Sequence, residues 1–394
     1  MDYHQKNILS KNGEKNCIIL FKGGFQYNVV NYFVDDLAES FVKLGFTSRV
    51  IDLTKNDFAA KLQEQINKGN IKCFFAFNGI GLPSLGELAV ELKVPFINFY
   101  LDSPIYHLQR LQYKSENLKI IFIDKNDLQF SNEILNQEAS FIPHGAFTKL
   151  NSAGVSKNKS GIIFAGSITK PELLRNQWLK LGKAIGEIYD SLLEYVINKE
   201  YFNIKHDVDY ILKVKGIELS MEQKKTIYFN SIFVHKYVRQ YRRLKVLEAL
   251  KDFKIDLYGN GWNTVPIHPN HTYHGAVDFL ELIERVKKSS LMLNVLPEFI
   301  YGGHERIFTA MYHGTACLTN YNAYLKTNFE NGKDLLFYSM RDLKQLPDQL
   351  SVWLSDKMAL EQIARSGMEK VKTHHTWLNR AQDLLHLIET DLSN

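Results

Sequence analysis

Short apolar runs alternate with segments of helical period along most of the sequence, and this alternation limits the folds open to the chain. CIILF (17–21) is followed by a segment whose apolar residues recur at intervals of three and four between Val30 and Leu44. Runs rich in β-branched and aromatic residues are typical of strands. Strands separated by helices predict a parallel, doubly wound α/β sheet. Further strands are expected at SRVIDL, CFFAFNG, PFINFYLD, KIIFID and ASFIPHG.

The alternation is interrupted twice, which predicts two domains and an insertion. A polar linker, NSAGVSKNKS (151–160), precedes a second set of strand-like runs that begins with GIIFAGS and continues through KIDLYGN, SLMLNVLP, TACLTN and DLLFYS. We expect one Rossmann-like domain over 1–150 and a second over 161–394 that ends in a C-terminal helix. Between about 171 and 252 helical periodicity dominates, which predicts a helical insertion in the second domain. A chain of 394 residues is long enough for two cores.

Composition excludes several classes of protein. The 48 Lys and Arg residues exceed the 43 Asp and Glu residues only slightly, which argues against a nucleic-acid partner and is compatible with anionic substrates or peripheral contact with an anionic membrane surface. Cys17, Cys73 and Cys317 each lie within an apolar run, as expected for buried free thiols in a reducing compartment. The first sixteen residues lack a signal-peptide pattern. We therefore expect a cytoplasmic protein and leave its oligomeric state open.

The segment from Val234 to Leu250 predicts an amphipathic helix. Its apolar stripe includes the tyrosines, whereas its basic residues lie off the stripe. The basic face either points to solvent or contacts lipid phosphates or an acidic acceptor. These basic residues are Lys236, Arg239, Arg242 and Arg243.

Glycine turns follow four of the predicted strands. Each turn lets the backbone approach a ligand closely, although a plain turn has the same sequence. Ligands of open α/β sheets bind at the carboxyl ends of the strands, so we expect these turns to border the site. They are Gly23-Gly24, Gly166-Ser167, Gly259 to Trp262, and Gly302-Gly303.

The last turn leads into HERIF, where a helix is expected to begin near His304. The positive end of that helix and the guanidinium of Arg306 predict a diphosphate site. A salt bridge between Arg306 and Glu305 is the alternative. The sequence contains no G-x-x-x-x-G-K-[ST] loop, which argues against a P-loop nucleotidase.

The order of these motifs resembles CgeB-like, group-1-type glycosyltransferases. The resemblance runs through IPHG, GIIFAGS, IDLYGNGW and ERIFTAMYHGTACLTN, and YLDSP followed by IIFID resembles the amino-terminal domain joined to them. It implies the GT-B architecture, in which two Rossmann-like doubly wound domains face each other across a cleft. It also implies transfer of a sugar from a nucleoside diphosphate sugar, with a UDP-sugar as the first choice, to a hydroxyl-bearing acceptor such as a glycan, lipid-linked glycan, small molecule or protein.

The resemblance also implies which residues hold the donor, with no permanent cofactor and no metal. Related enzymes usually have a ribose-binding glutamate where this chain has Thr309, so Glu305 or Thr309 is the candidate substitute. The paired acids of retaining relatives are also missing, because Arg306 stands eight residues after Glu298; we nevertheless expect retention. The donor-side candidates are Gly166, Ser167, Lys170, Arg175, Gly259, Gly261, Trp262, Gly302, Gly303, His304, Arg306 and Thr309.

On the acceptor side, Asp102 follows an apolar strand and is expected at the carboxyl edge of the first sheet. A helix cap at the following segment is the alternative. His144 in IPHG either binds the donor or is a packed histidine at the domain junction. Asp102, His144 and Glu305 are the candidate catalytic residues; Gly23, Gly24, Asn78 and Tyr106 are the other acceptor-side candidates.

No metal site is expected. Asp207-Val208-Asp209 has the letters of a D-x-D motif but lies in the predicted insertion, where we expect solvated carboxylates, and His374-His375 has no third ligand near it in sequence. Two other functions stay open. One is a different GT-B-shaped enzyme, such as a nucleotide-sugar epimerase or phosphorylase, and the other is a catalytically silent sugar-nucleotide-binding protein.

Overall fold

A computed structural model describes residues 16–150, 159–295 and 299–391. Most of the predicted linker, the first fifteen residues and Glu298 lie outside the described residues. The chain divides into two compact units. One comprises Met1–Ile123, Asp127–Lys149 and His375–Asn394, and the other comprises Asp124–Asn126 and Leu150–His374.

The first unit contains a parallel sheet of six strands in the order β2-β1-β3-β4-β5-β6. The predicted strands are confirmed, although the run ASFIPHG contributes only the two residues of β6. β1, β3 and β4 are buried almost throughout, since helices cover both faces of the sheet. The strands are β1 (Cys17–Lys22), β2 (Thr47–Asp52), β3 (Ile71–Phe77), β4 (Phe96–Tyr100), β5 (Leu118–Phe122) and β6 (Ser140–Phe141).

The helix expected after β1 is α1 (Val29–Lys43), and its predicted apolar stripe faces the core. Phe33, Val34, Leu37 and Phe41 on this stripe are at most 2% exposed. The other helices of the unit connect successive strands. They are η1 (Gln26–Asn28), α2 (Phe58–Asn67), α3 (Ser84–Glu91), η2 (Pro104–Tyr106), α4 (Leu108–Leu111), α5 (Lys125–Phe130) and η3 (Ser131–Leu135).

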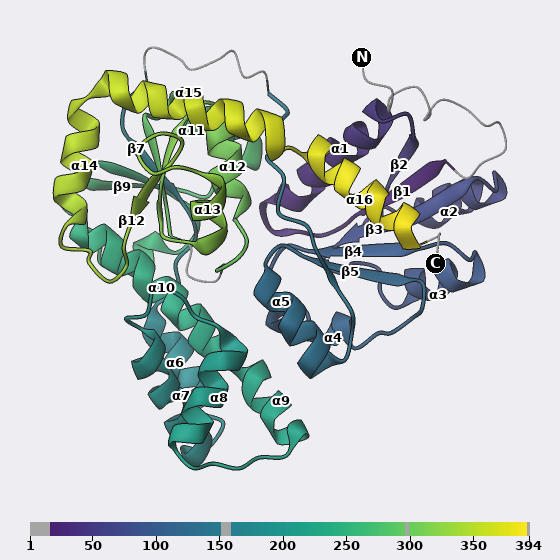
Figure 1. Ribbon diagram of the computed structural model, residues 1–394, viewed down its shortest axis with the longest axis horizontal. Helices are drawn as coiled ribbons and strands as arrows, with labels where there is room; N and C mark the ends of the chain where they lie inside the picture. The colour runs from purple at the N-terminus through teal and green to yellow at the C-terminus, as the bar shows by residue number, and fades with distance from the viewer. Residues whose placement is uncertain (1–15, 151–158, 296–298, 392–394) are drawn as a thin grey trace. The chain divides into compact units, whose positions relative to one another are not determined.

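The sequence predicted a C-terminal helix in the second domain. That helix, α16 (Trp377–Asp391), belongs instead to the first unit. It lies beside α1, so helices from early and late in the sequence pack together in one unit (Figure 1). Trp377 is fully buried, and its ring contacts those of Phe33, Phe77 and Phe99 at centroid distances of 5.7, 5.4 and 6.1 Å. Burial of this indole among aromatic rings explains why the helix packs here.

The second unit also contains a parallel sheet of six strands, in the order β12-β11-β10-β7-β8-β9. β9 was not predicted, because its residues alternate between buried and exposed and include two histidines. Together the two sheets confirm the doubly wound α/β fold. The strands are β7 (Ile162–Ala165), β8 (Ile255–Tyr258), β9 (His271–Gly275), β10 (Leu291–Asn294), β11 (Ala316–Asn320) and β12 (Leu336–Tyr338).

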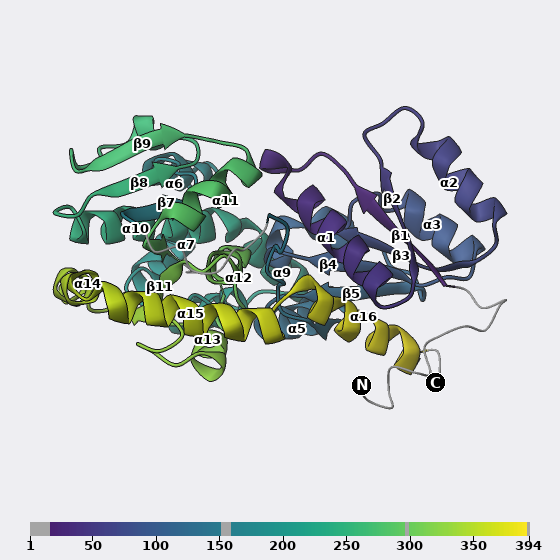
Figure 2. The ribbon, with the colours of Figure 1, turned by 90° about the horizontal axis from the view of Figure 1, so that it is seen from above.

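Helices cover both faces of the second sheet, because alternate strand residues point to opposite sides. Ile162 and Phe164 of β7 share a core with α10, α14 and α15, whereas Ile163 and Ala165 share one with α11 and α12. Figure 2 shows α15 next to α12 and α14. These helices are α10 (Ile232–Ala249), α11 (Phe279–Lys288), α12 (Glu305–Tyr312), α13 (Ala323–Asn328), α14 (Leu346–Ser355) and α15 (Lys357–His374); the turn η4 (Trp262–Thr264) follows β8.

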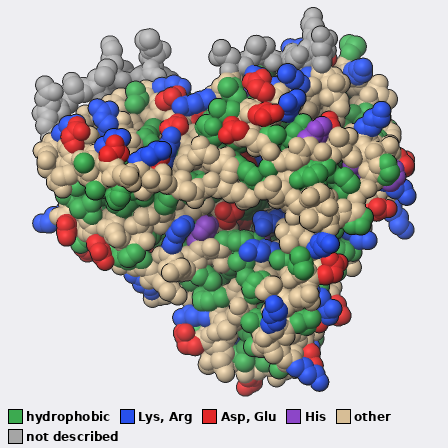
Figure 3. All heavy atoms as spheres, turned by 180° about the vertical axis from the view of Figure 1, so that it is seen from behind, with side chains coloured by type: hydrophobic (Ala, Val, Ile, Leu, Met, Phe, Trp, Pro, Cys, Tyr) green, Lys and Arg blue, Asp and Glu red, His purple; other side chains and the backbone are tan. Residues whose placement is uncertain are grey.

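The predicted helical insertion is present between β7 and β8. It consists of α6 (Pro171–Leu179), α7 (Lys183–Val196), α8 (Ile204–Val214), α9 (Met221–Asn230) and α10, and α6 to α9 form a lobe beside the second sheet (Figure 1). On the face shown in Figure 3, Lys and Arg side chains of this lobe lie among hydrophobic and acidic side chains. That face therefore carries no continuous basic patch.

The three cysteines are buried free thiols, as predicted. Burial raises the pKa of both Cys73 and Cys317 to about 12, which keeps these thiols protonated and unreactive at neutral pH. Among the described residues, none of the helices combines the length and the apolar character that crossing a bilayer requires.

Candidate functional site

The carboxyl edge of the second sheet has its topological switch point between β7 and β10. From β7 the chain proceeds outward to β8 and β9, and it then returns to β10 on the other side of β7 before continuing to β11 and β12. Doubly wound sheets bind ligands at this kind of edge. Gly166 follows β7 directly, and the loop after β10 leads to α12, so the predicted donor-side segments meet at the switch point.

His304 and Arg306 are joined at the start of α12. His304 is the N-cap, and its Nδ1 accepts from the main-chain N–H of Arg306 at 3.4 Å and from Arg306 Nε at 3.2 Å. Glu305 contacts the His304 ring, and its Oε1 lies 3.8 Å from Arg306 Nε. The alternative, a salt bridge between Arg306 and Glu305, is thus present, but with a long separation between the two charged groups. The Arg306 side chain is 13% exposed.

The turn after β7 receives side-chain donors on three consecutive carbonyls. Arg306 Nη1 donates to the carbonyl of Ala165, Trp262 Nε1 to that of Gly166 at 2.7 Å, and Arg243 Nη1 to that of Ser167. A Cβ on Gly166 would lie 3.2 Å from both Arg243 Cζ and Arg306 Nη1. A side chain here would crowd two guanidinium groups, which would have to shift by a few tenths of an ångström.

The glycines after β8 support this turn. A Cβ on Gly259, whose φ is +126°, would lie 2.6 Å from the Gly166 carbonyl carbon, and one on Gly261 would collide with the carbonyl oxygen of Ile168. Trp262 is fully buried and packs against Phe164 at 5.7 Å. These residues hold the β7 turn, and the Trp262 ring lies in the core, where it presents no face for a base to stack on.

Three other donor-side candidates differ in their surroundings: Thr309 is buried, Arg175 is ion-paired and Lys170 is exposed. Thr309 is 2% exposed, whereas the Glu305 side chain is 15% exposed, so of the two candidates for the missing ribose contact Glu305 is the more accessible one. Arg175 on α6 forms a bidentate ion pair with Asp190 of α7, and these hydrogen bonds raise the pKa of Arg175. Lys170, the N-cap of α6, is exposed.

Gly302 and Gly303 are buried in the loop before α12. Asn322 Nδ2 donates to the Gly302 carbonyl at 2.9 Å, and a Cβ on Gly303 would lie 2.6 Å from the Phe308 ring. The loop is also fixed by Asp124, which follows β5. Its Oδ2 accepts from the main-chain N–H groups of Ile300 and Tyr301.

In the first unit, Asp102 lies just beyond the end of β4. Its side chain is 49% exposed, and its Oδ2 lies 3.7 Å from His107 Nε2. The N-cap of η2 is Ser103 and not Asp102, which argues against the capping alternative. The amide oxygen of Asn78, itself 7% exposed, accepts from the main-chain N–H of Leu101 at 2.8 Å. Asn78 therefore positions the backbone beside Asp102.

The remaining acceptor-side candidates differ in their surroundings. His144 is 2% exposed, its Nδ1 donates to the Gly145 carbonyl at 2.7 Å, and its ring packs between Phe33 and Trp377. This matches the packed-histidine alternative. Gly23 exchanges two hydrogen bonds with the Asn31 side chain. No atom lies within 4 Å of the position that a Cβ on Gly24 would take, and Tyr106 is half-buried in η2.

The sequence misplaced two basic residues of α10. Arg242 is fully buried and Arg243 is 6% exposed, so neither lies on a solvated or lipid-facing surface. The helix is surrounded by α6, α7 and α9, and its last turns enter the core of the sheet. Arg242 donates to carbonyls at the end of α7, namely those of Val196, Lys199 and Glu200, and thereby caps that helix.

The D-x-D letters also lie in a different environment from the one predicted. Asp207 is fully buried, accepts from the main-chain N–H of Asn203 at 2.9 Å and pairs with Lys199. It stabilises the start of α8 and is not solvated. Within the part of the chain that the structure describes, no cluster of three or more His, Cys, Asp or Glu residues is arranged to hold a metal ion.

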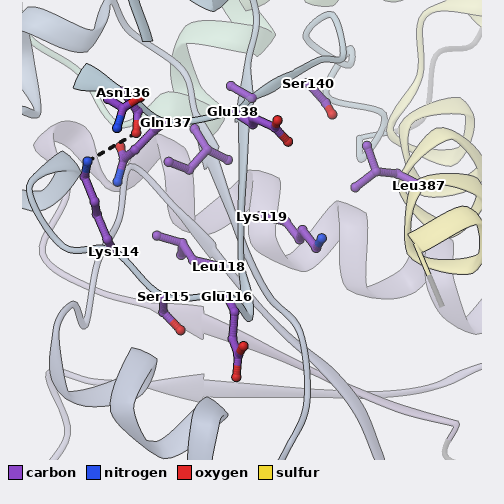
Figure 4. Close-up of a pocket in the computed structure, with 12 residues that line it drawn as sticks. Lys114, Ser115, Glu116, Leu118, Lys119, Asn136, Gln137, Glu138, Ser140 and Leu387 are labelled. Carbon is purple, nitrogen blue, oxygen red and sulfur yellow. Dashed lines mark hydrogen bonds between the residues drawn. The ribbon is translucent and has the colours of Figure 1, made fainter. Parts of the chain in front are cut away.

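A cavity of about 550 Å³ lies in the first unit, away from these candidates. Figure 4 shows its lining of Lys114, Glu116, Lys119, Gln137 and Glu138, with Leu387 of α16 at one side. Residues 114–120 precede or begin β5, so the cavity borders the amino ends of the strands. Asp102 and Asn78 follow their strands at the opposite edge.

Comparisons with known proteins bear on the second unit and on the whole fold. Residues 239–386 match the profile of a family described as "Glycosyl transferase-like". This segment contains β8, the glycine turns at Gly259 and Gly302, and α12, whereas the Gly166 turn lies outside it. The segment is glycosyltransferase-like. The resemblance to group-1-type glycosyltransferases is confirmed to this extent, whereas the CgeB-like assignment stays a prediction. A comparison with curated protein sequences finds no match.

Solved structures share the fold over nearly the whole chain. HepE of Anabaena in complex with UDP-glucose has a TM-score of 0.55 at 10% identity, covering 95% of this chain and 100% of HepE. A sucrose-phosphate synthase from Thermosynechococcus elongatus has a TM-score of 0.53 at 10% identity, covering 96% and 99%. A glycosyltransferase from Rickettsia africae has a TM-score of 0.51 at 12% identity, also covering 96% and 99%. The expected GT-B fold, with two Rossmann-like domains, is therefore confirmed.

Proposed function

We propose that the protein is a glycosyltransferase whose donor is a nucleoside diphosphate sugar. The observation that carries this proposal is the position of Arg306, which reaches from the first turn of α12 to the Gly166 turn at the switch point of the second sheet. A cation in the first turn of a helix is electrostatically disfavoured unless an anion binds nearby. The helix end and the guanidinium together suit a diphosphate. A UDP-sugar is the first choice, because HepE binds UDP-glucose on the same fold.

In this reaction the bond between the anomeric carbon and the diphosphate oxygen breaks, and a bond to the acceptor oxygen forms. Arg306 and the N–H groups at the start of α12 offset the negative charge that develops on the leaving diphosphate. These groups take the place of a metal ion in the proposal. We propose retention of configuration, with the proton of the acceptor hydroxyl passing to the departing diphosphate.

For the acceptor, we propose the carboxyl edge of the first sheet, next to Asp102. The half-exposed carboxylate can accept a hydrogen bond from an acceptor hydroxyl, and His107 Nε2 lies 3.7 Å from its Oδ2. Asn78 holds the backbone at Leu101, one residue before Asp102. The reaction requires that the acceptor carry a free hydroxyl group.

The test is to incubate the purified protein with a panel of nucleotide sugars and to measure release of nucleoside diphosphate. We expect slow hydrolysis with at least one UDP-sugar, unchanged by excess chelator. Arg306→Gln should lose both the release and the rise in melting temperature that UDP causes in the parent protein. The proposal is wrong if Arg306→Gln binds UDP as tightly as the parent, and loss of activity on chelation would overturn its metal-independent part.

A catalytically silent binding protein is the second candidate, and the position of Thr309 favours it. The resemblance implies a ribose-binding glutamate where this chain has Thr309, which is 2% exposed. In that case UDP would raise the melting temperature without any turnover. An isomerised sugar in the same assay would instead indicate an epimerase, and phosphate-dependent release a phosphorylase.

A further inference from the structure

Arg243 lies next to the proposed diphosphate site, although it belongs to the helical insertion and was expected to face solvent, lipid phosphates or an acidic acceptor. It projects from α10, is 6% exposed, and donates through Nη1 to the Ser167 carbonyl. Its guanidinium lies 5.9 Å above the Phe164 ring of β7. The carbonyl and the ring hold it in one orientation at the end of the strand.

Two guanidinium groups therefore converge on one glycine from different helices. The point where a Cβ of Gly166 would stand lies 3.2 Å from Arg243 Cζ and 3.2 Å from Arg306 Nη1. The two groups carry like charges and are largely shielded from water, so they repel each other. A dianion that binds both groups offsets their positive charges and removes this repulsion, which favours its binding.

We infer that Arg243 is a second diphosphate-binding residue, which acts together with Arg306 across the Gly166 turn. The inference rests on the proposed function and extends it, since it makes the insertion part of the donor site. The forked guanidinium suits a phosphate oxygen pair better than a lysine would. Residues that only support the turn, such as Trp262, contribute no charge to it.

The test compares binding of UDP and of inorganic pyrophosphate by calorimetry in the parent, Arg243→Gln and Arg243→Lys. Pyrophosphate lacks the base and ribose, so it reports on the anion site alone. Loss of a hydrogen-bonded charge should weaken both ligands by about ten- to a hundredfold. Arg243→Lys should recover part of this loss, and the dependence of affinity on salt should be shallower in Arg243→Gln.

Lys245→Gln is the matched control, because Lys245 is exposed on the same helix and its loss removes the same charge. It should bind both ligands as the parent does. Arg243→Gln and Arg306→Gln should also be less than additive in combination, because both groups bind one anion. If Arg243→Gln does not fold, Arg243→Lys alone decides: affinity equal to the parent's for both ligands, with an unchanged salt dependence, would overturn the inference.

The outcomes separate this inference from the proposed function. If the parent binds neither UDP nor pyrophosphate, the proposed function fails and this inference fails with it. If the parent binds both and Arg243→Gln binds them equally well, the glycosyltransferase proposal stands and Arg243 only supports the Ser167 carbonyl.

Discussion

The carboxylate of Asp124 accepts the main-chain N–H of Ile300 at 2.7 Å, although 176 residues separate the two along the chain. The same Oδ2 accepts from Tyr301 at 2.9 Å, and Oδ1 accepts from Asn126 at 2.8 Å. Burial outweighs these hydrogen bonds and raises the pKa of Asp124 to about 6. The loop before α12 is therefore held by a group that titrates near neutral pH.

This pKa predicts a pH dependence of stability. The folded protein binds the Asp124 proton more tightly than the unfolded chain does, so this contribution is complete below about pH 4 and is lost as the pH rises through 6. The loss amounts to about 3 kcal/mol at most. Urea unfolding at pH 4.5 and 7.5 should show that Asp124→Asn gains stability relative to the parent at the higher pH. The exposed Asp252→Asn should show no such gain, and equal behaviour of the two variants would contradict the assignment.

Gly259→Ala should destabilise the β7 turn and abolish UDP binding. A Cβ there would lie 2.6 Å from the Gly166 main chain, at a φ of +126°, so Gly166 would have to move. Gly275→Ala provides the comparison, because its φ is also positive, at +82°, but nothing lies within 4 Å of its Cβ. Both variants suffer backbone strain of about 1–3 kcal/mol, and only Gly259→Ala should also lose UDP binding by calorimetry. Intact binding in Gly259→Ala would show that the turn tolerates displacement.

Asp102→Asn distinguishes two roles of the acceptor-side carboxylate. If Asp102 is the general base of an inverting reaction, its loss should reduce turnover by about 10² to 10⁴-fold. If it only orients the acceptor in a retaining reaction, the loss is about tenfold or less. We expect the smaller effect, together with retained configuration of the product by NMR. An inverted product with a severely impaired variant would reverse this expectation. Glu39→Gln in the same unit, whose carboxylate pairs with Lys149, should leave turnover unchanged.

Trp377→Ala should destabilise the first unit by about 3–5 kcal/mol, since it removes a fully buried indole. Its ring contacts His144 at 5.0 Å as well as the three phenylalanines. Urea unfolding should show the loss, whereas UDP affinity should change little because the proposed donor site lies in the second unit. Trp377→Phe keeps part of the aromatic packing and should recover much of the stability. An unchanged unfolding midpoint in Trp377→Ala would mean that α16 is not part of the unit's core.

The sheets could be predicted from the sequence because their central strands are buried on both faces and therefore appear as continuous apolar runs. β9 could not, since an edge strand such as HTYHG is half exposed and has no apolar pattern. The glycine turns could be predicted because a sharp turn after a strand restricts the residue type that can stand there. Their surroundings could not be predicted, because the close approach of Gly259 to Gly166 depends on contacts between distant segments.

The burial of Arg242 and Arg243 could not be predicted from helical periodicity. A helical pattern gives the direction of each side chain but not the elements that pack around the helix, and α10 is enclosed on several sides. The same holds for Asp207, which is fully buried: its neighbour Lys199 precedes it by eight residues, and only the fold brings the two charges together. His144 could be read in two ways because its partners Phe33 and Trp377 lie far away in sequence.

The placement of α16 has a consequence for synthesis on the ribosome. The first unit receives α16 only after residues 150–374 of the second unit have been translated, so its aromatic core around Phe33 and Phe77 stays incomplete until then. The second unit, which comprises Asp124–Asn126 and Leu150–His374, has been translated completely before α16 is made. Nascent chains released early, before residue 377, would present those rings to solvent and to each other, and such apolar surfaces promote aggregation.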